Sequence, residues 1–412
     1  MVVRALLILF IGSLPWLWMD LGGSSQFAIR PSIATGLLLT LYLLGRKSYG
    51  FPRSHFLMLL FFMLSIFIWL MPSLLYRSPH WSSSKVLSLF AYAAVSYYPA
   101  RAFVSEWRNS QGQKFWWILL IVMIGSCLAS FYLAFGTLLP DTRITDSTQF
   151  IHGSLYGGVF ASGDDGAGKG IRHSMALFPV LILIITLAVS DISPGLRIGA
   201  GLLALYLLVF TLSRSSWLVA VFIGMIVLSS NYWLSAKNFK NVLLPFSLML
   251  VVAFVASLSL PGFFDWVYNL IGDRMLDSKS TDGRLSVLGQ AFRELSVSEL
   301  LTGIDRIGQA KPHNFLLDSL MQSGLLGFVV ALIIVVRVWM LYLRGFATNK
   351  IALLLASCFA APAVVRFFTA GSGVLHILEI FGILVALELT RSSRLVSAPA
   401  IQPQAVMGMQ RT

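Results

Sequence analysis

Charged residues are scarce in this chain of 412 residues, making up 11% of it, whereas hydrophobic residues make up 57%. The interior of a water-soluble domain is too small to bury so large an apolar fraction. The apolar residues also form long continuous runs, whereas a membrane β-barrel would show short segments of alternating polarity. The composition therefore excludes both classes and predicts an all-α polytopic membrane protein.

Cysteine and histidine are also rare. The two cysteines, Cys127 and Cys358, both lie in apolar runs, so the sequence predicts no disulfide framework. The six histidines show none of the spacings that hold zinc. The sequence therefore gives no sign of a zinc site or of a bound cofactor.

Apolar runs of about twenty residues, the length needed to cross a bilayer as a helix, occur about twelve times. The predicted spans are residues 5–19, 28–45, 54–72, 83–100, 115–139, 174–190, 195–211, 214–231, 241–260, 313–342, 350–366 and 372–390. The first run has the position of a signal peptide, but "SLPWLWMD" offers no small-residue cleavage site. We therefore expect it to remain as the first membrane helix.

Basic residues are distributed unevenly between the two sides of this topology. With the N-terminus in the cytoplasm, the cytoplasmic segments hold more than half of the 30 basic residues but few acids, namely Glu106, Asp191 and Glu388. Such an excess is the usual signal for the cytoplasmic side. The net charge of +13 therefore reflects membrane orientation and does not indicate a nucleic-acid partner. Both termini are predicted to be cytoplasmic.

Two connections between the predicted spans are long, residues 140–173 and residues 261–312, and both lie on the outer side. Residues 1–260 then contain the first nine spans, residues 313–390 contain the last three, and residues 391–412 form a cytoplasmic tail. The larger loop contains an amphipathic aromatic stretch, "PGFFDWVYNLIG", and a helix start, "TDGRLSVLGQAFREL". We therefore expect short helices in this loop, and any active site on the outer face.

The shorter of these loops contains "SGDDGAGKG", which has the glycine and lysine spacing of a phosphate-binding P-loop. Gly170 stands where that motif needs Ser or Thr, no strand precedes it, and ATP is absent outside the cytoplasm. We interpret it as a flexible glycine-rich loop. Asp164 and Asp165 have the chemistry to bind a divalent cation, but adjacent aspartates in such a loop are more often a solvated turn.

Four arginines lie on the outer side of the predicted topology. Arg172 precedes the sixth span, Arg214 separates the seventh and eighth, Arg284 begins the loop helix, and Arg366 ends the eleventh span. A single arginine in such a position ordinarily extends to lipid headgroups. Several around one face suit a pyrophosphate, because each guanidinium stays charged and binds phosphate oxygens in a bidentate manner.

His313 and Asn314 follow Pro312, where the larger loop ends and the tenth span begins. Pro312 suits the first position of a helix, and the positive end of a helix dipole favours the neutral imidazole that a general base requires. The alternative is an interfacial histidine that is hydrogen-bonded to a loop carbonyl. His376 and Glu379, three residues apart in the last span, are placed to touch, and we expect a structural pair there.

The segment "LTGIDRIGQAKPHNFLLDSLMQSGLLG" resembles the signature of the O-antigen ligase superfamily, in which a His-Asn pair precedes Gly-x-x-Gly, here Gly324 and Gly327. The stretch "TDGRLSVLGQAF" is similar to the Gly-Arg helix start of that family, at Arg284. "LSRSSWL" is similar to its arginine at the outer end of a membrane helix, Arg214. The single large loop after the ninth span also matches the family. The resemblance covers residues 170–345.

The resemblance implies a GT-C-type membrane glycosyltransferase in the inner membrane of a Gram-negative bacterium, with its active site facing the periplasm. The donor would be O-antigen on undecaprenyl pyrophosphate, and the acceptor a sugar hydroxyl of lipid A-core. Transfer would be inverting and metal-independent. His313 would act as the base, while Arg214 and Arg284, with Arg172, would hold the pyrophosphate. Arg366 and Asn314 are further candidates for the same site.

Three alternatives stay open. An O-antigen polymerase would use the same chemistry on another acceptor, and a protein O-oligosaccharyltransferase would modify serine on a periplasmic protein. A lipid-linked oligosaccharide flippase or other transporter would place its charges along a pathway at the middle of the membrane. In this sequence the charges gather near the outer ends of the spans. Membrane lipids are expected partners in every case.

Overall fold

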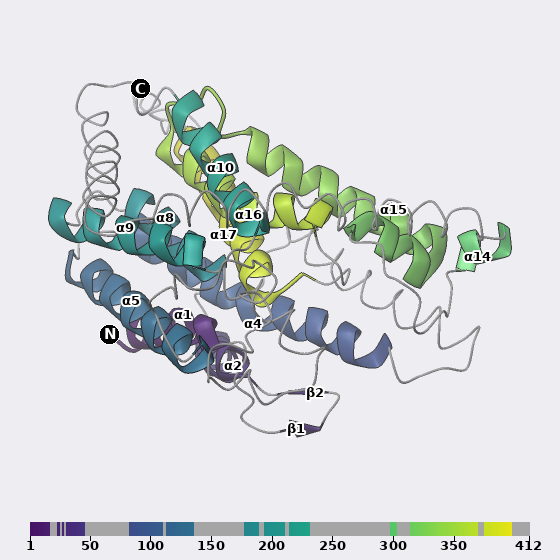
Figure 1. The fold of residues 1–412 in the computed structure, drawn as a ribbon, viewed down its shortest axis with the longest axis horizontal. Helices are drawn as coiled ribbons and strands as arrows, with labels where there is room; N and C mark the ends of the chain where they lie inside the picture. The colour runs from purple at the N-terminus through teal and green to yellow at the C-terminus, as the bar shows by residue number, and fades with distance from the viewer. Residues whose placement is uncertain are drawn as a thin grey trace, which may run out of the picture.

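The structure is a computed structural model, and it describes residues 1–16, 23–24, 27–28, 30–45, 82–109, 113–135, 177–188, 193–210, 214–230, 297–302, 314–369 and 375–397. The described part of the chain is helical (Figure 1). Its helices are α1 (Val2–Ser13), α2 (Pro31–Leu44), α4 (Ser82–Arg108), α5 (Gln113–Phe135), α8 (Leu177–Ala188), α9 (Pro194–Phe210), α10 (Arg214–Ser229), α14 (Val297–Thr302), α15 (Phe315–Leu343), α16 (Ile351–Thr369) and α17 (Ile377–Ser397).

Two smaller features complete the described elements. A 3₁₀ turn, η1 (Leu14–Trp16), continues α1. A two-residue antiparallel pair, β1 (Gly23–Ser24) and β2 (Phe27–Ala28), lies between α1 and α2. Neither was predicted from the sequence, because segments this short have no apolar period to detect.

The prediction of a helical fold built from apolar helices is confirmed for the described residues. Within the described ranges, three helical segments are long and apolar enough to cross a membrane, Lys114–Leu133, Ser323–Leu343 and Ile351–Phe368. The predicted spans 54–72 and 241–260 lie outside the described residues, and each of the other predicted spans overlaps a described helix. Of the short helices expected in the larger loop, α14 is described, and it packs against α15.

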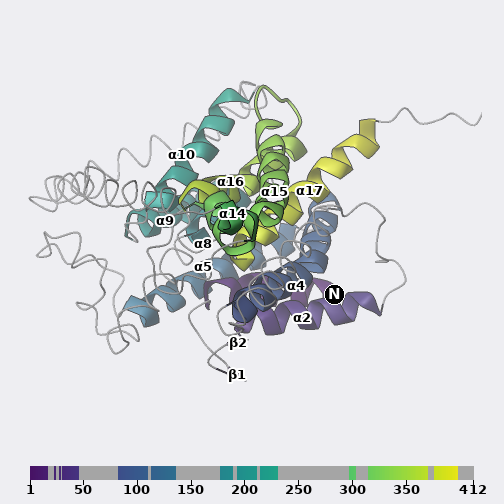
Figure 2. The same ribbon diagram turned by 90° about the vertical axis from the view of Figure 1, so that its right-hand side faces the viewer.

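The last two helices form the centre of the fold. α16 packs against α8, α10, α15 and α17, and α17 also packs against α4 (Figures 1 and 2). Gly382 on α17 permits a close approach of the two backbones, because a Cβ at that position would lie 2.5 Å from the carbonyl oxygen of Phe359 on α16. Small residues at such crossings let helix backbones pack closely when no hydrophobic effect drives them together.

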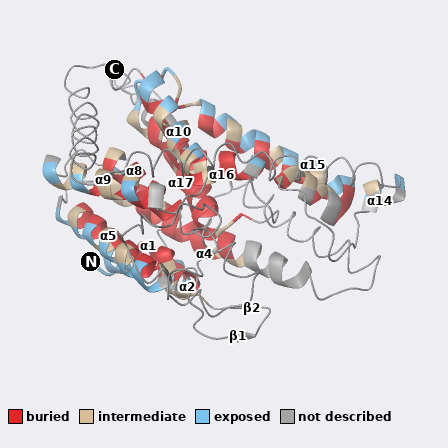
Figure 3. Cartoon of the chain, in the orientation of Figure 1, coloured by how far each residue is buried: buried red, intermediate tan, exposed pale blue. Residues whose placement is uncertain are grey.

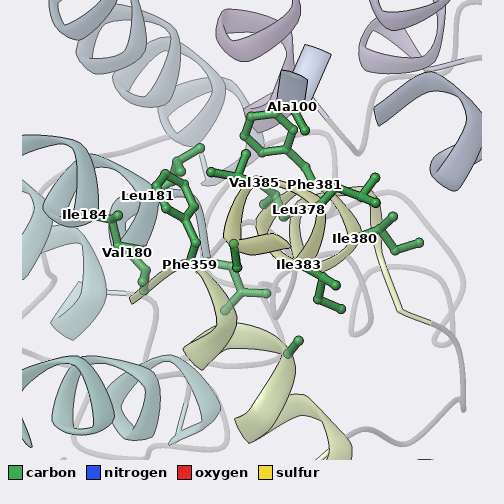
Figure 4. Packing of buried hydrophobic residues seen from close by; sticks show 14 of the residues in the cluster. Ala100, Val180, Leu181, Ile184, Phe359, Leu378, Ile380, Phe381, Ile383 and Val385 are labelled. Atoms are coloured by element: carbon green, nitrogen blue, oxygen red, sulfur yellow. The ribbon is translucent and has the colours of Figure 1, made fainter. Parts of the chain in front are cut away.

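Aromatic rings fill the space around this crossing. Phe103 on α4 lies edge-on to Phe359, Phe381 and Trp116, at centroid distances of 5.5, 6.1 and 5.5 Å. Phe381 also contacts Phe10 on α1. Around them, aliphatic side chains from α8 and α17 complete the buried cluster (Figure 4). The core therefore joins helices from both ends of the chain.

Hydrogen bonds from side chains to backbone carbonyls link neighbouring helices at several crossings. Ser357 Oγ donates to the Leu341 carbonyl at 3.0 Å, which joins α16 to α15. The Tyr342 hydroxyl donates to the Phe222 carbonyl at 3.2 Å, which joins α15 to α10. Serine and tyrosine groups in these positions add directional links to packing between apolar helices.

One face of α15 is apolar and exposed (Figure 3). Its exposed residues recur with helical spacing, at Leu325, Val329, Leu332, Val336, Met340 and Leu343. Ile334 and Val338, which point away from this face, are fully buried. An apolar stripe of this length suits contact with lipid chains, in agreement with the hydropathy of the segment.

The start and the course of α15 differ from the prediction of one helix beginning at Pro312 and running through 342. The helix begins at Phe315, and Gly324 interrupts it with φ 62° and ψ −162°. This backbone conformation is essentially restricted to glycine. The membrane-length segment therefore starts near the interruption, at Ser323, and a shorter helical segment, residues 315–323, precedes it.

Candidate functional site

Half of the residues of the predicted site, His313, Arg172 and Arg284, lie outside the described part of the chain. Asp164 and Asp165, the residues considered for a cation, also lie outside it. Arg214 is the first residue of α10, but its side chain is outside the described residues. The two predicted site residues whose side chains are described are Asn314 and Arg366.

Asn314 caps the N-terminus of α15. Its side-chain oxygen accepts hydrogen bonds from the backbone N–H groups of Leu316 and Leu317, at 3.0 and 3.3 Å. Asparagine is among the strongest residues for this role, because it satisfies donors that the first helical turn leaves free. The prediction that Pro312 begins the helix was therefore wrong by three positions, since the capping bonds start the helix at Phe315. His313 immediately precedes the cap in sequence.

Arg366 lies in the last turn of α16, as the sequence indicated, and it is buried. Its Nε is 3.6 Å from Oε1 of Glu379, and the side chains of the two residues are 9% and 0% exposed. Within the described part of the chain, neither of these two atoms forms a hydrogen bond. The pair is thus a buried charge contact longer than a hydrogen bond.

Glu379 is also fixed by its own helix. Its Oε2 accepts a hydrogen bond of 2.7 Å from the backbone N–H of His376, just before the first turn of α17. The predicted link between His376 and Glu379 is therefore made through the backbone of His376, and the charged partner of Glu379 is Arg366. The carboxylate lies at the positive end of α17, where a negative charge is favoured.

An aromatic contact joins the end of α16 to the start of α15. The rings of Phe315 and Phe367 have their centroids 5.0 Å apart. Phe367 follows Arg366, and Phe315 follows the capping Asn314. The structure thus brings Asn314 and Arg366, the two described candidates, to neighbouring helix ends.

A second arginine belongs to the same end of the molecule. Arg30 precedes Pro31 at the start of α2, and its Nη1 donates to the hydroxyl of Tyr92 on α4 at 3.0 Å. Tyr92 is buried on α4, and α4 packs against α17, the helix that carries Glu379. We call Arg30, Tyr92, Arg366 and Glu379 the arginine cluster; it joins α2, α4, α16 and α17.

Sequence reasoning missed Arg30 and Tyr92. Arg30 did carry a signal, because it lies at the outer end of the second predicted span, directly before Pro31. Arg366 lies in the same way at the outer end of the eleventh predicted span. Tyr92 lies inside an apolar run, and nothing in its immediate sequence marks it.

The other end of α17 carries a comparable charged pair. Oε1 of Glu388 is 3.9 Å from Nε of Arg101 on α4, and the guanidinium of Arg101 lies 6.0 Å from the ring centroid of Tyr97. Arg4 and Glu106 join α1 to α4 through a shorter contact of 2.8 Å. These residues belong to segments that the predicted topology places at the cytoplasmic side.

Metal binding has no candidate among the described residues, since no group of three or more His, Cys, Asp or Glu side chains gathers there. Cys127 and Cys358 are both buried and free. Whether the complete site uses a metal depends also on Asp164 and Asp165, so metal independence stays a prediction.

Comparison with known proteins found no matching family model, no matching curated protein and no matching solved structure.

Proposed function

We propose that this protein is an O-antigen ligase, which transfers O-antigen from undecaprenyl pyrophosphate to a sugar hydroxyl of lipid A-core and so completes lipopolysaccharide. The observation that carries the proposal is the pairing of helix ends at Phe315 and Phe367. It sets the capped start of α15, preceded in sequence by His313, beside the end of α16 that carries the buried Arg366.

The proposed setting is the inner membrane of a Gram-negative bacterium, with twelve spans, cytoplasmic termini and a GT-C-type fold. The apolar helices and the exposed apolar face of α15 support a membrane location. The excess of basic residues on one side of the predicted topology supports the orientation. In this orientation the arginine cluster faces the periplasm, where lipid-linked O-antigen is presented.

In the proposed reaction His313 accepts the proton of the acceptor hydroxyl as the oxygen attacks the anomeric carbon of the donor sugar. A new carbon–oxygen bond forms, the bond to the pyrophosphate breaks, and the configuration inverts. Undecaprenyl pyrophosphate leaves with the bonding electron pair, and His313 then releases its proton to water. Histidine suits this role because its ring is largely neutral near pH 7.

The arginines are proposed to stabilise the leaving group. Arg214, Arg284 and Arg172 would contact the pyrophosphate, whose negative charge grows as the bond to the sugar breaks. Fixed guanidinium groups in a site sheltered from water can provide this stabilisation in place of a metal ion. Both substrates carry lipid chains, which explains a site at the membrane surface.

A transporter is the main alternative from another class, and the position of the charges argues against it. The buried pair that would mark a pathway, Arg366 and Glu379, lies at helix ends and not at the middle of helices. Transport sites of lipid-linked or charged substrates are expected near the middle of the membrane.

The test is a reaction in detergent with purified protein, lipid-linked O-antigen and lipid A-core, followed by electrophoresis of the lipopolysaccharide. Ligated product is expected with the native chain and not with His313→Ala. A native chain that inserts and folds but yields no ligated product would overturn the proposal. Supplying a core that already carries one repeat, or a periplasmic acceptor protein, separates the polymerase and the protein O-oligosaccharyltransferase.

A further inference from the structure

We propose that Arg366 binds the phosphate groups of the lipid-linked donor and that Glu379 is the positioning residue that holds its guanidinium in place. This inference rests on the proposed function for the identity of the donor. It adds to the pyrophosphate site a described side chain, and it gives a role to the fully buried carboxylate of Glu379.

The first argument is the energetic cost of the pair. Removing two charges from water is expensive, and apolar side chains of similar size often stabilise a protein as well or better. The pair does not repay this cost through an ideal contact, because its atoms are 3.6 Å apart and Arg366 Nε and Glu379 Oε1 form no hydrogen bond within the described chain. Stability therefore gives a weak reason for these residues, and binding of an ion gives a stronger one.

The second argument is the way in which Glu379 is held. Its Oε2 is fixed by the backbone N–H of His376, and the whole side chain is 0% exposed. Glu379 therefore cannot follow a mobile partner, and it confines Arg366 to one region at the end of α16. The contact engages the guanidinium at Nε, and a guanidinium carries five N–H donors in a planar fork that matches phosphate.

The third argument is the charge of the surroundings. Among the described side chains, the arginine cluster contains two guanidinium groups, Arg30 and Arg366, and one carboxylate, Glu379, so positive charge is in excess there. Arg30 is partly exposed and is oriented by the Tyr92 hydroxyl. An anion is the ligand that such a cluster favours, because guanidinium groups in excess over carboxylates bind phosphate oxygens through strong charged hydrogen bonds.

The experiment replaces each of two charged pairs on α17 by apolar residues. The test variant is Arg366→Met with Glu379→Leu. The matched control is Arg101→Met with Glu388→Leu, which removes the pair near the other end of the same helix. Because both partners leave together, neither variant strands a buried charge, and both are expected to fold. The melting temperature of the test variant is expected to lie slightly below that of the control, because Glu379→Leu also removes the acceptor of the His376 N–H.

Kinetics then separate binding from structure. The test variant is expected to raise the KM for the lipid-linked donor by about ten- to a hundredfold, the loss typical of a charged hydrogen bond, and to leave the KM for lipid A-core unchanged. The control variant is expected to keep the native KM for the lipid-linked donor and for lipid A-core. A test variant that folds and keeps the native donor KM would overturn the inference.

Single variants examine the positioning role. Glu379→Gln keeps the size of the side chain and its acceptor oxygen but removes its charge, so Arg366 is held less firmly and the donor KM is expected to rise less than in the double variant. Glu379→Asp, which keeps the charge, is expected to recover part of the loss. Equal donor KM values for Glu379→Gln and the native chain would show that Arg366 acts without Glu379.

A direct binding measurement distinguishes failure of this inference from failure of the proposed function. The probe is undecaprenyl pyrophosphate in detergent, with undecaprenol as the phosphate-free comparison. If the native chain binds the pyrophosphate and the test variant does not, the inference holds even where lipid A-core proves to be the wrong acceptor. If the test variant ligates and binds like the native chain, the inference fails and the ligase function stands.

Discussion

At the scale of single residues, the proposed chemistry depends on His313. His313→Ala is expected to lower ligation in cells by at least about a hundredfold, because a positioned base contributes about 10²–10⁴ to such a step. Electrophoresis of lipopolysaccharide from cells that lack the native gene measures the effect, with membrane levels of the protein checked by immunoblot. The comparison is His55→Ala, near the cytoplasmic end of the predicted span 54–72. Full ligation by His313→Ala would remove this residue from the mechanism.

Asn314 allows a second prediction at the same scale, because the structure gives it a capping role. Asn314→Ala removes the acceptor for the N–H groups of Leu316 and Leu317 and is expected to destabilise the protein by about 1 kcal/mol. Asn314→Asp keeps an acceptor and should retain stability. Thermal unfolding in detergent provides the measurement.

The same pair of variants separates the cap from a contact with substrate. If Asn314→Asp retains stability but loses ligation, the amide group itself acts on a substrate. If both stability and ligation follow the capping ability of the side chain, Asn314 acts by fixing the start of α15.

At the scale of elements, the interruption of α15 gives the next prediction. Gly324→Ala is expected to destabilise the protein by about 1–3 kcal/mol, because φ 62° with ψ −162° is strained for any residue with a Cβ. Gly125→Ala on α5 is the matched control, since an added Cβ there meets no atom within 4 Å. The two variants are compared by thermal unfolding in one detergent. Equal stability of both would mean that α15 runs straight in solution.

The elements also show which parts of the structure the sequence could predict. The long apolar runs predicted the bounds of α5 and α16 to within a few residues, because hydropathy and length are local properties of the chain. The start of α15 was misplaced, because Pro312 is an acceptable first residue but the side chain of Asn314 makes the capping bonds. The conformation of Gly324 gave no signal, since glycine is compatible with a continuous helix as well as with an interruption.

Contacts between elements were harder to predict than the elements. Glu379 was matched with His376, its neighbour in sequence, whereas its charged partner is Arg366, thirteen positions earlier and on another helix. Arg30 and Tyr92 are 62 positions apart. Such partners depend on how helices pack, and one sequence carries no direct record of packing. For His313, Arg172 and Arg284, which lie outside the described residues, the assignment remains a prediction from sequence.

At the scale of the whole molecule, the predicted independence from metal ions can be tested directly. Ligation by the purified protein is expected to continue unchanged in excess EDTA, because fixed guanidinium groups take the place of a cation at the leaving group. The measurement is the initial rate with and without chelator, after dialysis to remove bound ions. Loss of activity that Mg²⁺ or Ca²⁺ restores would contradict the prediction and would direct attention to Asp164 and Asp165.

The central position of α16 and α17 has a consequence for how the protein is made. These helices leave the ribosome after all the others described, yet they cover the inner faces of α4, α8, α10 and α15. Until they are inserted, the earlier helices have no partner for those faces, so the tertiary structure can close only once translation has nearly finished. A nonsense mutation between residues 350 and 377 would therefore leave an open bundle exposed to membrane proteases, and such truncations should behave in cells like loss of the whole protein.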